Sequence, residues 1–373
     1  MIVPDLLYPY QAVADATERP AWWPDRAADP RQSLGWARGT RRDGDSLWFA
    51  GAPDGPALWT RWITGDGVLP RMNAVDVCAG LVAGVEADPV GVAEARAASH
   101  HQVVLAANGY VSPLITAGPA SDGEVQKLLA EVVRAATDAG AVPSVLHCSP
   151  GDPLLGLLPD LGFVTGITDL YAVIDLPGDS VEDYLAALPG HRRQNVRREM
   201  RALEQGGRGR IVFGADAQPH LADACELAAQ AYLQRGDDDV PLAEIVEVYR
   251  RLLAGVGDDF ALCLVEVDGV PVASCCLVTG ESDILAYSAG MRNPQAREVA
   301  GYFNACYYLP IELAYRRGAK RLLIGPMALE AKRLRGAEVV PVLSAVPRTC
   351  APLARLLAAT DEYMRKEWES LPA

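Results

Sequence analysis

The chain has 373 residues and a formal net charge of −14, with half of its residues apolar and 22% charged. This composition excludes a disordered chain, and the length predicts two domains of similar size. The acidic balance argues against nonspecific DNA binding. No apolar run reaches the about 18–20 residues that a membrane-spanning helix needs, and residues 1–10 lack the basic start of a signal peptide, so we expect a soluble, cytoplasmic protein.

In the first half of the chain, alternating and 3.6-residue apolar patterns predict six strands and three helices. The predicted strands are Ser46–Ala50, Ala57–Thr64, His101–Ala106, Tyr110–Thr116, Ser144–His147 and Thr168–Leu176, and the predicted helices are Pro89–Ala98, Asp122–Ala139 and Asp152–Leu161.

The second half repeats this mixture, and Asp268-Gly269 predicts a tight hairpin turn between two of its strands. The predicted helices are Val181–Glu204, Ala217–Arg235, Leu242–Ala254 and Ala296–Arg317, and the predicted strands are Arg210–Phe213, Phe260–Val267, Val270–Thr279, Asp283–Met291 and Arg321–Ile324.

Two segments share one order of elements. Tyr110–His147 and Asp283–Ile324 both read strand–helix–strand, and a glycine closes each helix, Gly140 and Gly318. We therefore predict an α/β protein of two copies of one unit, residues 1–179 and 180–373. Hairpins mixed with strand–helix–strand crossovers predict a mixed sheet flanked by helices in each unit.

A basic segment interrupts the acidic chain. Residues His191–Arg210 hold seven arginines and two acids, a net charge of +5 from seven minus two. Arg193, Arg197 and Arg201 share one helix face at i, i+4 spacing, where like charges repel by roughly 0.2–0.5 kcal/mol per pair. The compensating anion is a nucleic-acid phosphate, a nucleotide diphosphate or acids of the first domain, and the sequence leaves these three open.

The segment after the last predicted strand combines a glycine turn with cations. Gly325 is followed by Lys332, Arg335 and Gly336, and Lys332 is one of only four lysines among 34 basic residues. The preceding helix carries the aromatic cluster Tyr302, Phe303, Tyr307 and Tyr308. The eight cysteines and five histidines show no metal-ligand spacing, so we expect no metal site and no structural disulfide.

These features together resemble the Fem-like branch of the GNAT acyltransferase superfamily. The resemblance covers roughly residues 100–346 and rests on the tandem units, on Asp169-Leu-Tyr171 and Asp175-Leu-Pro177 between them, on the arginine helix, and on the series Tyr302, Tyr307, Tyr308, Glu312, Gly318, Gly325, Lys332, Arg335 and Gly336. It implies tandem GNAT-like units and an enzyme that acylates an amine. Many members of this branch use aminoacyl-tRNA to build peptidoglycan bridges.

Two departures from the pattern bear on the substrates. The loops 292–301 and 118–123 fit poorly to the glycine-rich turn that holds the pyrophosphate of acyl-CoA in many GNAT enzymes. The helical hairpin that some bridge-forming members insert is also missing, which weakens the case for a cell-wall precursor as acceptor. We therefore favour aminoacyl-tRNA as donor over acyl-CoA, with no permanently bound cofactor and a small-molecule or peptide amine as acceptor.

No Ser-His-Asp or Cys-His arrangement is visible, so the expected reaction is direct attack of the amine in the second unit, with oxyanion donors near Ser288–Met291. The first unit, whose loop 148–166 has no Lys or Arg, is expected to be inert. The candidate catalytic residues are Lys332, Tyr302, Tyr307 and Asp283, and the candidate phosphate- or substrate-binding residues are Arg193, Arg197, Arg201, Arg335 and Tyr308.

Each candidate also has a structural interpretation. The tyrosines match a helix core stripe, Asp283 is a turn acid, Lys332 is a solvated loop lysine, and Arg335 pairs with Glu330 or Glu338. The alternatives for the whole chain are an acyl-CoA N-acyltransferase with a divergent phosphate loop and a catalytically silent binding protein. The sequence does not identify the acyl group, the acceptor, the pathway or the oligomeric state.

Overall fold

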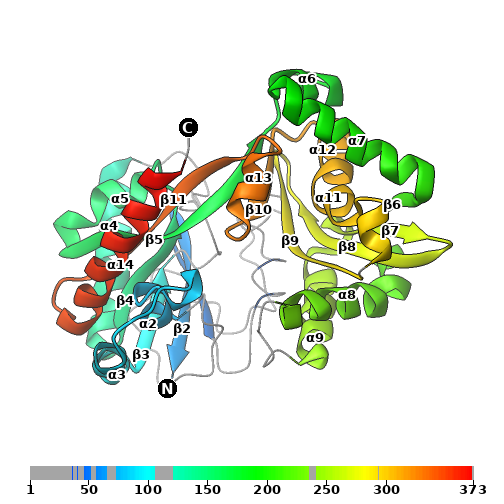
Figure 1. Cartoon of the computed structure of the whole chain (residues 1–373). Helices are drawn as coiled ribbons and strands as arrows, with labels where there is room; N and C mark the ends of the chain where they lie inside the picture. The colour runs from blue at the N-terminus through cyan, green and yellow to red at the C-terminus, as the bar shows by residue number, and fades with distance from the viewer. Residues whose placement is uncertain are drawn as a thin grey trace. The chain divides into compact units, whose positions relative to one another are not determined.

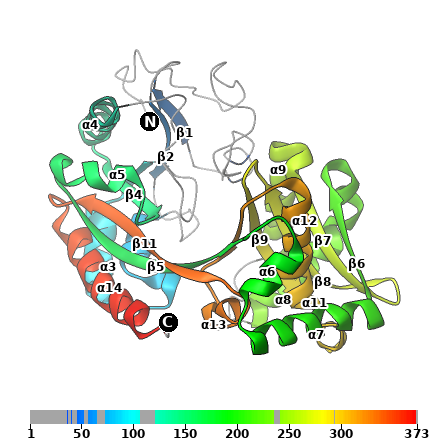
Figure 2. The same ribbon diagram turned by 90° about the horizontal axis from the view of Figure 1, so that it is seen from above.

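The computed structural model describes residues 36, 40, 46–51, 56–64, 73–105, 121–234, 241–292 and 294–371 (Figures 1 and 2). These residues form two compact units. The first contains the described residues of 46–171 and 340–371, and the second contains residues 36, 40 and the described residues of 172–339. Two strands, β5 (Phe163–Asp175) and β11 (Glu338–Pro347), carry the chain from one unit to the other.

The first unit is built on a mixed sheet with the strand order β1-β2-β3-β4-β11-β5. Strand β3 pairs in parallel with β4, and the pairs β1–β2, β2–β3 and β4–β11 are antiparallel. Its other strands are β1 (Ser46–Gly51), β2 (Ala57–Thr64), β3 (His101–Leu105) and β4 (Val142–Cys148), and its helices are α2 (Ala74–Cys78), α3 (Pro89–Ala98), α4 (Asp122–Asp138), α5 (Pro153–Leu157) and α14 (Ala351–Ser370), with the 3₁₀ turns η4 (Leu81–Ala83) and η5 (Pro159–Leu161).

The last 32 described residues belong to the first unit, whereas the sequence predicts a second unit that runs from 180 to 373. Helix α14 packs on α2 and α3, where Thr360 donates to the carbonyl of Cys78 at 2.8 Å. Asp361 of α14 accepts from the backbone N–H of Ile167 in β5 at 2.7 Å. The difference arises because β11 leaves the second unit and pairs with β4, which brings the helix behind it into the first unit.

The second unit has the strand order β5-β10-β9-β8-β7-β6. Strands β9 and β10 are parallel, and the other pairs are antiparallel. Its strands besides β5 are β6 (Arg208–Phe213), β7 (Phe260–Val267), β8 (Val270–Thr279), β9 (Asp283–Met291) and β10 (Arg321–Gly325). Its helices are α6 (Val181–Ala187), α7 (Gly190–Gly206), α8 (Leu221–Gln234), α9 (Leu242–Val256), α10 (Gln295–Glu298), α11 (Gly301–Phe303), the π-helix η8 (Asn304–Tyr308), α12 (Leu309–Arg317) and α13 (Leu329–Arg333), with the 3₁₀ turns η6 (Gly214–His220) and η7 (Gly257–Asp259).

Helices cover both faces of the second sheet, with α8 and α9 on one side and α7, α11 and α12 on the other (Figure 1). Successive residues of β8 serve opposite faces, as the period of a strand requires. Ser274 donates to the carbonyl of Ala224 in α8, whereas Cys275 lies in the core cluster that includes Cys306 of η8. The predicted fold class, α/β with a mixed sheet flanked by helices in each unit, is confirmed.

The predicted helix Val181–Glu204 is two helices. Helix α6 ends at Ala187, Leu188 has an extended backbone, and α7 begins at Gly190. Pro189 accounts for the break, because a proline lacks the N–H that a helix interior needs and disfavours a helical residue before it. The predicted strand Tyr110–Thr116 lies outside the described residues.

The predicted helix Ala296–Arg317 is also interrupted. Ala300 takes a left-handed backbone conformation (φ 48°) between α10 and α11, and the five residues of η8 then form a π-helix before α12. Pro310 follows this widened turn, and it has no N–H to donate to the carbonyl four residues earlier. By contrast, the predicted hairpin turn Asp268-Gly269 is confirmed, with both residues at positive φ.

Candidate active site

An opening between β9 and β10 provides the setting of the site. The two strands pair only from Asp283 to Leu285, and β9 then continues to Met291 without β10 beside it. On its other edge β9 stays paired with β8, with a bulge at Tyr287. Beyond Leu285 the backbone of β9 therefore has no ladder partner on β10. This separation of the two strands is what the expected oxyanion donors on β9 require.

A close helix contact holds β9 in place beyond this point. A Cβ atom at Gly290 would lie 1.9 Å from the carbonyl oxygen of Leu227 in α8. Only glycine permits this approach of two backbones.

Lys332 lies at the end of β10. The short helix α13 follows that strand, and the Lys332 side chain is buried, with 4% of the residue exposed. Its Nζ donates to the carbonyl oxygen of Gly325, the last residue of β10, at 2.7 Å. The amine therefore sits where β10 ends, on the strand that borders the opening, and Lys332 is not the solvated loop lysine of the structural interpretation.

Arg335 is buried and directed inward. Its Nη2 binds Glu199 Oε1 of α7 at 2.7 Å, its Nε donates to the Tyr308 hydroxyl at 3.0 Å, and its Nη1 donates to the carbonyl of Ala331 at 2.8 Å. The guanidinium also stacks on the Phe303 ring, 3.3 Å from its centroid. All three nitrogens are engaged, so the predicted role as a phosphate ligand does not match this geometry, and the partner is Glu199 instead of Glu330 or Glu338.

Tyr308 completes this buried cluster, since its hydroxyl also donates to Glu199. Burial raises the pKa of the Tyr308 phenol far above its ordinary value, against the opposing effect of Arg335, and Glu199 raises it further. Tyr308 is therefore a neutral donor held inside the protein, which matches the core interpretation and not an exposed substrate ligand.

Tyr307 and Tyr302 lie next to this cluster with their rings 6.2 Å apart. The Tyr307 hydroxyl is buried without a hydrogen bond of ordinary geometry among the described residues, and burial raises the pKa of its phenol well above the usual range. A neutral phenol of this kind can donate a hydrogen bond to an oxygen that gains charge. The Arg335 guanidinium, three residues after Lys332 in the chain, lies 5.7 Å from the centroid of the Tyr307 ring. Among the predicted catalytic residues, Tyr302 and Tyr307 are thus neighbours of the segment that carries Lys332.

Asp283 belongs to a different region. Its carboxylate is buried at the start of β9 and accepts two hydrogen bonds from Arg321, at 2.6 and 2.8 Å. Gly325 lies four positions after Arg321 in β10, a distance of about 13 Å along a strand. The structure therefore does not bring Asp283 to Lys332, as a general base in one site with it would require.

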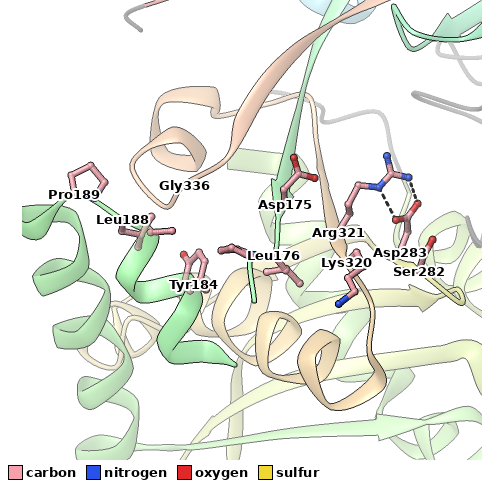
Figure 3. Close-up of a pocket in the computed structure, with 12 residues that line it drawn as sticks. Asp175, Leu176, Tyr184, Leu188, Pro189, Ser282, Asp283, Lys320, Arg321 and Gly336 are labelled. Atoms are coloured by element: carbon pink, nitrogen blue, oxygen red, sulfur yellow. Dashed lines mark hydrogen bonds and ion pairs between the residues drawn. The ribbon is translucent and has the colours of Figure 1, made fainter. Parts of the chain in front are cut away.

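The pair Asp283–Arg321 lines an open pocket of about 680 Å³ whose other side is formed by Tyr184, Leu188 and Gly336 (Figure 3). Lys320 at its rim lies 3.8 Å from Asp179. The cations of this pocket are thus matched by carboxylates, and its remaining walls are mostly apolar.

The predicted arginines of α7 lie on its outer face. Arg193 is half-buried and Arg197 and Arg201 are exposed, while Val196 and Leu203 on the inner face are buried. Arg197 pairs with Glu182 of α6 at 2.6 Å, where both side chains are largely exposed. Among the described residues, Arg193 and Arg201 have no acidic partner, so a basic surface remains on this helix.

Three backbone N–H groups of the segment that holds the pyrophosphate in many GNAT enzymes are engaged within the segment itself. The N–H groups of Ala296, Arg297 and Ala300 donate to carbonyls within 292–300. They are therefore not directed outward as an anion-binding nest requires. This geometry agrees with the poor sequence fit of the loop.

Sequence reasoning did not identify Glu199, Phe303 or Asn304 as residues of the site. Asn304 is buried, and its amide donates to the carbonyls of Glu199, Val299 and Ala300 at 3.0–3.1 Å. The sequence does contain a signal for Glu199, because this acid lies on the apolar stripe of α7 with Val196 and Leu203. An acid on a buried helix face indicates an ion pair with a buried cation. The eight cysteines are free thiols, seven of them buried, and no cluster of His, Cys, Asp or Glu among the described residues is placed to hold a metal ion.

Comparison with known protein families identifies the chain. Residues 114–371, more than half of the sequence, match the FemAB-like family, whose description is peptidoglycan biosynthesis and recognition. The chain belongs to the FemAB-like family. The resemblance found in the sequence is confirmed, and the chain is an enzyme of the acyltransferase class.

Solved structures of similar fold share little sequence with this FemAB-like chain. They include the C-terminal domain of a putative lysylphosphatidylglycerol synthetase from Agrobacterium fabrum, with a TM-score of 0.55, 13% identity, and coverage of 90% of this chain and 92% of that one. FemX has a TM-score of 0.55, 11% identity, and coverage of 84% and 90%. A conserved protein of unknown function from Bacteroides thetaiotaomicron has a TM-score of 0.54, 11% identity, and coverage of 90% and 99%.

A search of curated protein sequences finds no match. None of the helices that the structure describes is long and apolar enough to pass through a membrane.

Proposed function

We propose that this FemAB-like protein transfers an aminoacyl group from aminoacyl-tRNA to an amine by direct attack in the second unit. The observation that carries the proposal is the outer face of α7. There Arg193, Arg197 and Arg201 form a basic surface with one exposed acidic partner, on the helix that contacts the Lys332 segment through Glu199 and Arg335. The protein as a whole has a net charge of −14, so this group of arginines differs from the rest of the chain. It can bind phosphates despite the acidic total, because phosphates respond to the charge near them.

The engaged N–H groups of the segment before α11 support tRNA over acyl-CoA as donor. An acyl-CoA enzyme holds its pyrophosphate with outward N–H groups at a helix N-terminus. Here the N–H groups of Ala296, Arg297 and Ala300 donate within the segment. The arginines of α7 offer a different, larger phosphate surface, which suits a polynucleotide.

In the proposed reaction the acceptor amine attacks the ester carbonyl and the bond to the ribose oxygen breaks. The Lys332 amine and backbone N–H groups of β9 beyond Leu285 stabilise the negative charge on the carbonyl oxygen. A proton moves from the amine to the leaving ribose oxygen, and the neutral phenols of Tyr302 and Tyr307 can assist that transfer. The acceptor is a small molecule or peptide with a free amine, and the family description makes a peptidoglycan peptide the first to examine.

Binding of fluorescent total tRNA, measured by anisotropy over a range of salt, tests the donor. We expect binding that weakens with salt, and replacement of Arg193, Arg197 and Arg201 by alanine should lower the salt slope by about 2–3. The matched control replaces Arg134, Arg250 and Arg316, three exposed arginines elsewhere, and should leave the slope near that of the wild type. Equal losses in both triple variants, or tight binding of acetyl-CoA without tRNA binding, would reject the donor.

A further inference from the structure

Helix α13, which carries Lys332, is too short to hold its own shape. It has five residues, and helices of that length have almost no stability in water. Its N-cap Ala328 takes a left-handed conformation with no side-chain cap. The position of Lys332 must therefore be set by contacts from other elements.

Those contacts come from helices α6 and α7 and from Arg335, just after α13, and they are made to backbone carbonyls at the end of α13. The carbonyl of Ala331 accepts from Arg335 Nη1 at 2.8 Å, that of Arg333 from Arg192 Nη1 of α7 at 3.2 Å, and that of Arg335 from the Tyr184 hydroxyl of α6 at 2.8 Å. Side chains thus donate to three carbonyls at and just after the end of α13, where a helix leaves carbonyls without partners in its own backbone.

Glu199 is the acid on which this arrangement depends. Its Oε1 holds Arg335 Nη2 at 2.7 Å, and its other oxygen accepts from Tyr308, whose oxygen in turn accepts from Arg335 Nε. The Arg335 and Glu199 side chains are 8% and 16% exposed. Removing this carboxylate leaves a buried guanidinium without its counter-ion, so Arg335 must move, and Ala331 next to Lys332 loses its donor.

We propose that Glu199 is a positioning residue for Lys332, acting through Arg335 and Tyr308. The proposal rests on the catalytic role of Lys332 in the proposed function. It extends that role, because α7 holds Glu199 and Arg192 on its inner face and the phosphate-binding arginines on its outer face. One rigid helix then fixes the distance between a bound tRNA and the Lys332 amine.

The chain has only four lysines, so the accessibility of each can be measured separately. This tests the proposal without knowledge of the acceptor. Trace acetylation with acetic anhydride, followed by peptide mass spectrometry, gives the rate at each lysine. Lys320 in the same unit and Lys366 in the other have side chains 64% and 70% exposed and act as internal references. In the wild type we expect the buried Lys332 to react about tenfold more slowly than Lys320, since it reacts only when α13 opens.

Glu199→Gln should raise the Lys332 to Lys320 rate ratio by about fivefold or more, because it keeps the side-chain shape and removes the charge. The control Glu204→Gln removes an exposed charge from the same helix and should leave the ratio unchanged. If Glu199→Gln does not fold, Tyr308→Phe tests the proposal instead. Loss of the hydroxyl alone should raise the Lys332 to Lys320 rate ratio about twofold. An unchanged ratio in a folded Glu199→Gln or Tyr308→Phe variant, or an equal rise at Lys320, overturns the proposal.

The same variants separate this inference from the donor assignment. Glu199→Gln leaves the outer arginines in place, so its tRNA affinity should equal that of the wild type. If the wild-type protein does not bind tRNA but Glu199→Gln still raises the Lys332 to Lys320 rate ratio, the donor assignment is wrong and the positioning role of Glu199 stands. In a transfer assay, Glu199→Gln should lower kcat and leave KM for the donor unchanged.

Discussion

A lysine amine held against a backbone carbonyl inside a protein is costly, because burial penalises its charge. Lys332 is in this situation, with 4% of the residue exposed and its Nζ 2.7 Å from the oxygen of Gly325. A buried lysine is typical of a functional site, where its amine can stabilise an anionic carbonyl oxygen. The neighbouring Arg335 is paired with Glu199 at 2.7 Å, and its charge serves the fold.

A second ionisable group of the second unit gives a pH-dependent prediction. Burial raises the pKa of Glu312 above its ordinary value of 4.5, and Glu204 adds to this against the opposing effect of Arg316. A carboxyl with a raised pKa in the folded state destabilises the fold once it ionises. The penalty is absent below the ordinary pKa, grows as the pH rises from that value through the folded pKa, and is constant above it. Glu312→Gln should therefore increase the free energy of unfolding at pH 7.

Urea unfolding of Glu312→Gln and wild type between pH 4 and 8 measures this difference. The stabilisation should vanish as the pH falls below 4.5, the ordinary value. Glu338→Gln, at an exposed position, is the control and should show no such trend. A Glu312→Gln variant that is less stable than wild type at pH 7 would contradict the assignment.

At the residue scale the sequence predicted which side chains gather but not which way they face. Lys332, Tyr307, Tyr308 and Arg335 were all singled out, and the structure brings them to one region. The inward direction of Arg335 depends on Glu199, 136 residues earlier. No local pattern encodes a pairing at that separation, and only the acid on the apolar stripe of α7 hints at it.

At the element scale, the segment between β9 and α12 carries the site residues in an irregular helix. The π-helix η8 includes Tyr307 and Tyr308, and Asn304 at its start closes three carbonyls. π-Bulges are uncommon and are found often at functional sites. Here the wider turn orients the two tyrosines next to Arg335.

Asn304→Ala should lower stability by about 1–3 kcal/mol, because three buried carbonyls lose their donor. The measurement is the midpoint of urea unfolding followed by circular dichroism. Asn195→Ala on the exposed side of α7 is the matched control, with an expected change within about 0.5 kcal/mol. A similar small change in both variants would show that Asn304 does not hold the irregular turn.

The sequence pattern predicted most of the helices and strands, and the elements that it did not predict have identifiable physical causes. The strands β7, β8 and β9 and the hairpin turn were predicted with their observed bounds, since their apolar runs are bordered by turn residues. The break at Pro189 and the left-handed Ala300 were missed because an amphipathic pattern continues through both. Strand β11 and helix α14 were not predicted, since the similarity between the halves ends before them.

At the scale of the whole molecule, the chain passes from the first unit to the second along β5 and returns along β11. This return brings β11 and α14 to the first unit, where Leu353, Leu356, Leu357 and Met364 are buried. A sequence-based boundary assumes that each unit is continuous. It therefore cannot identify a C-terminal segment that completes the N-terminal unit.

A chain that ends at Val339 should lose the structure of its first unit. Burial of four large apolar side chains contributes about 6 kcal/mol or more, most of the stability of a typical domain. Hydrogen exchange should then be fast in α2, α3 and β3 while β7 and β8 stay protected. A chain that ends at Trp368 is the control, and lasting protection of β3 in the shorter chain would contradict the division.

In the proposed reaction the second unit transfers an aminoacyl group from tRNA, and Lys332 stabilises the charge on the carbonyl oxygen. The direct measurement supplies the wild-type protein with total tRNA charged with labelled amino acids and with a peptidoglycan peptide that has a free side-chain amine. Parallel reactions use labelled acetyl-CoA, Lys332→Ala, and Lys320→Ala as the matched lysine control. We expect an amide-linked label from tRNA only, reduced about a hundredfold or more in Lys332→Ala and unchanged in Lys320→Ala. Transfer from acetyl-CoA without transfer from tRNA, or full activity of Lys332→Ala, would contradict the proposed reaction.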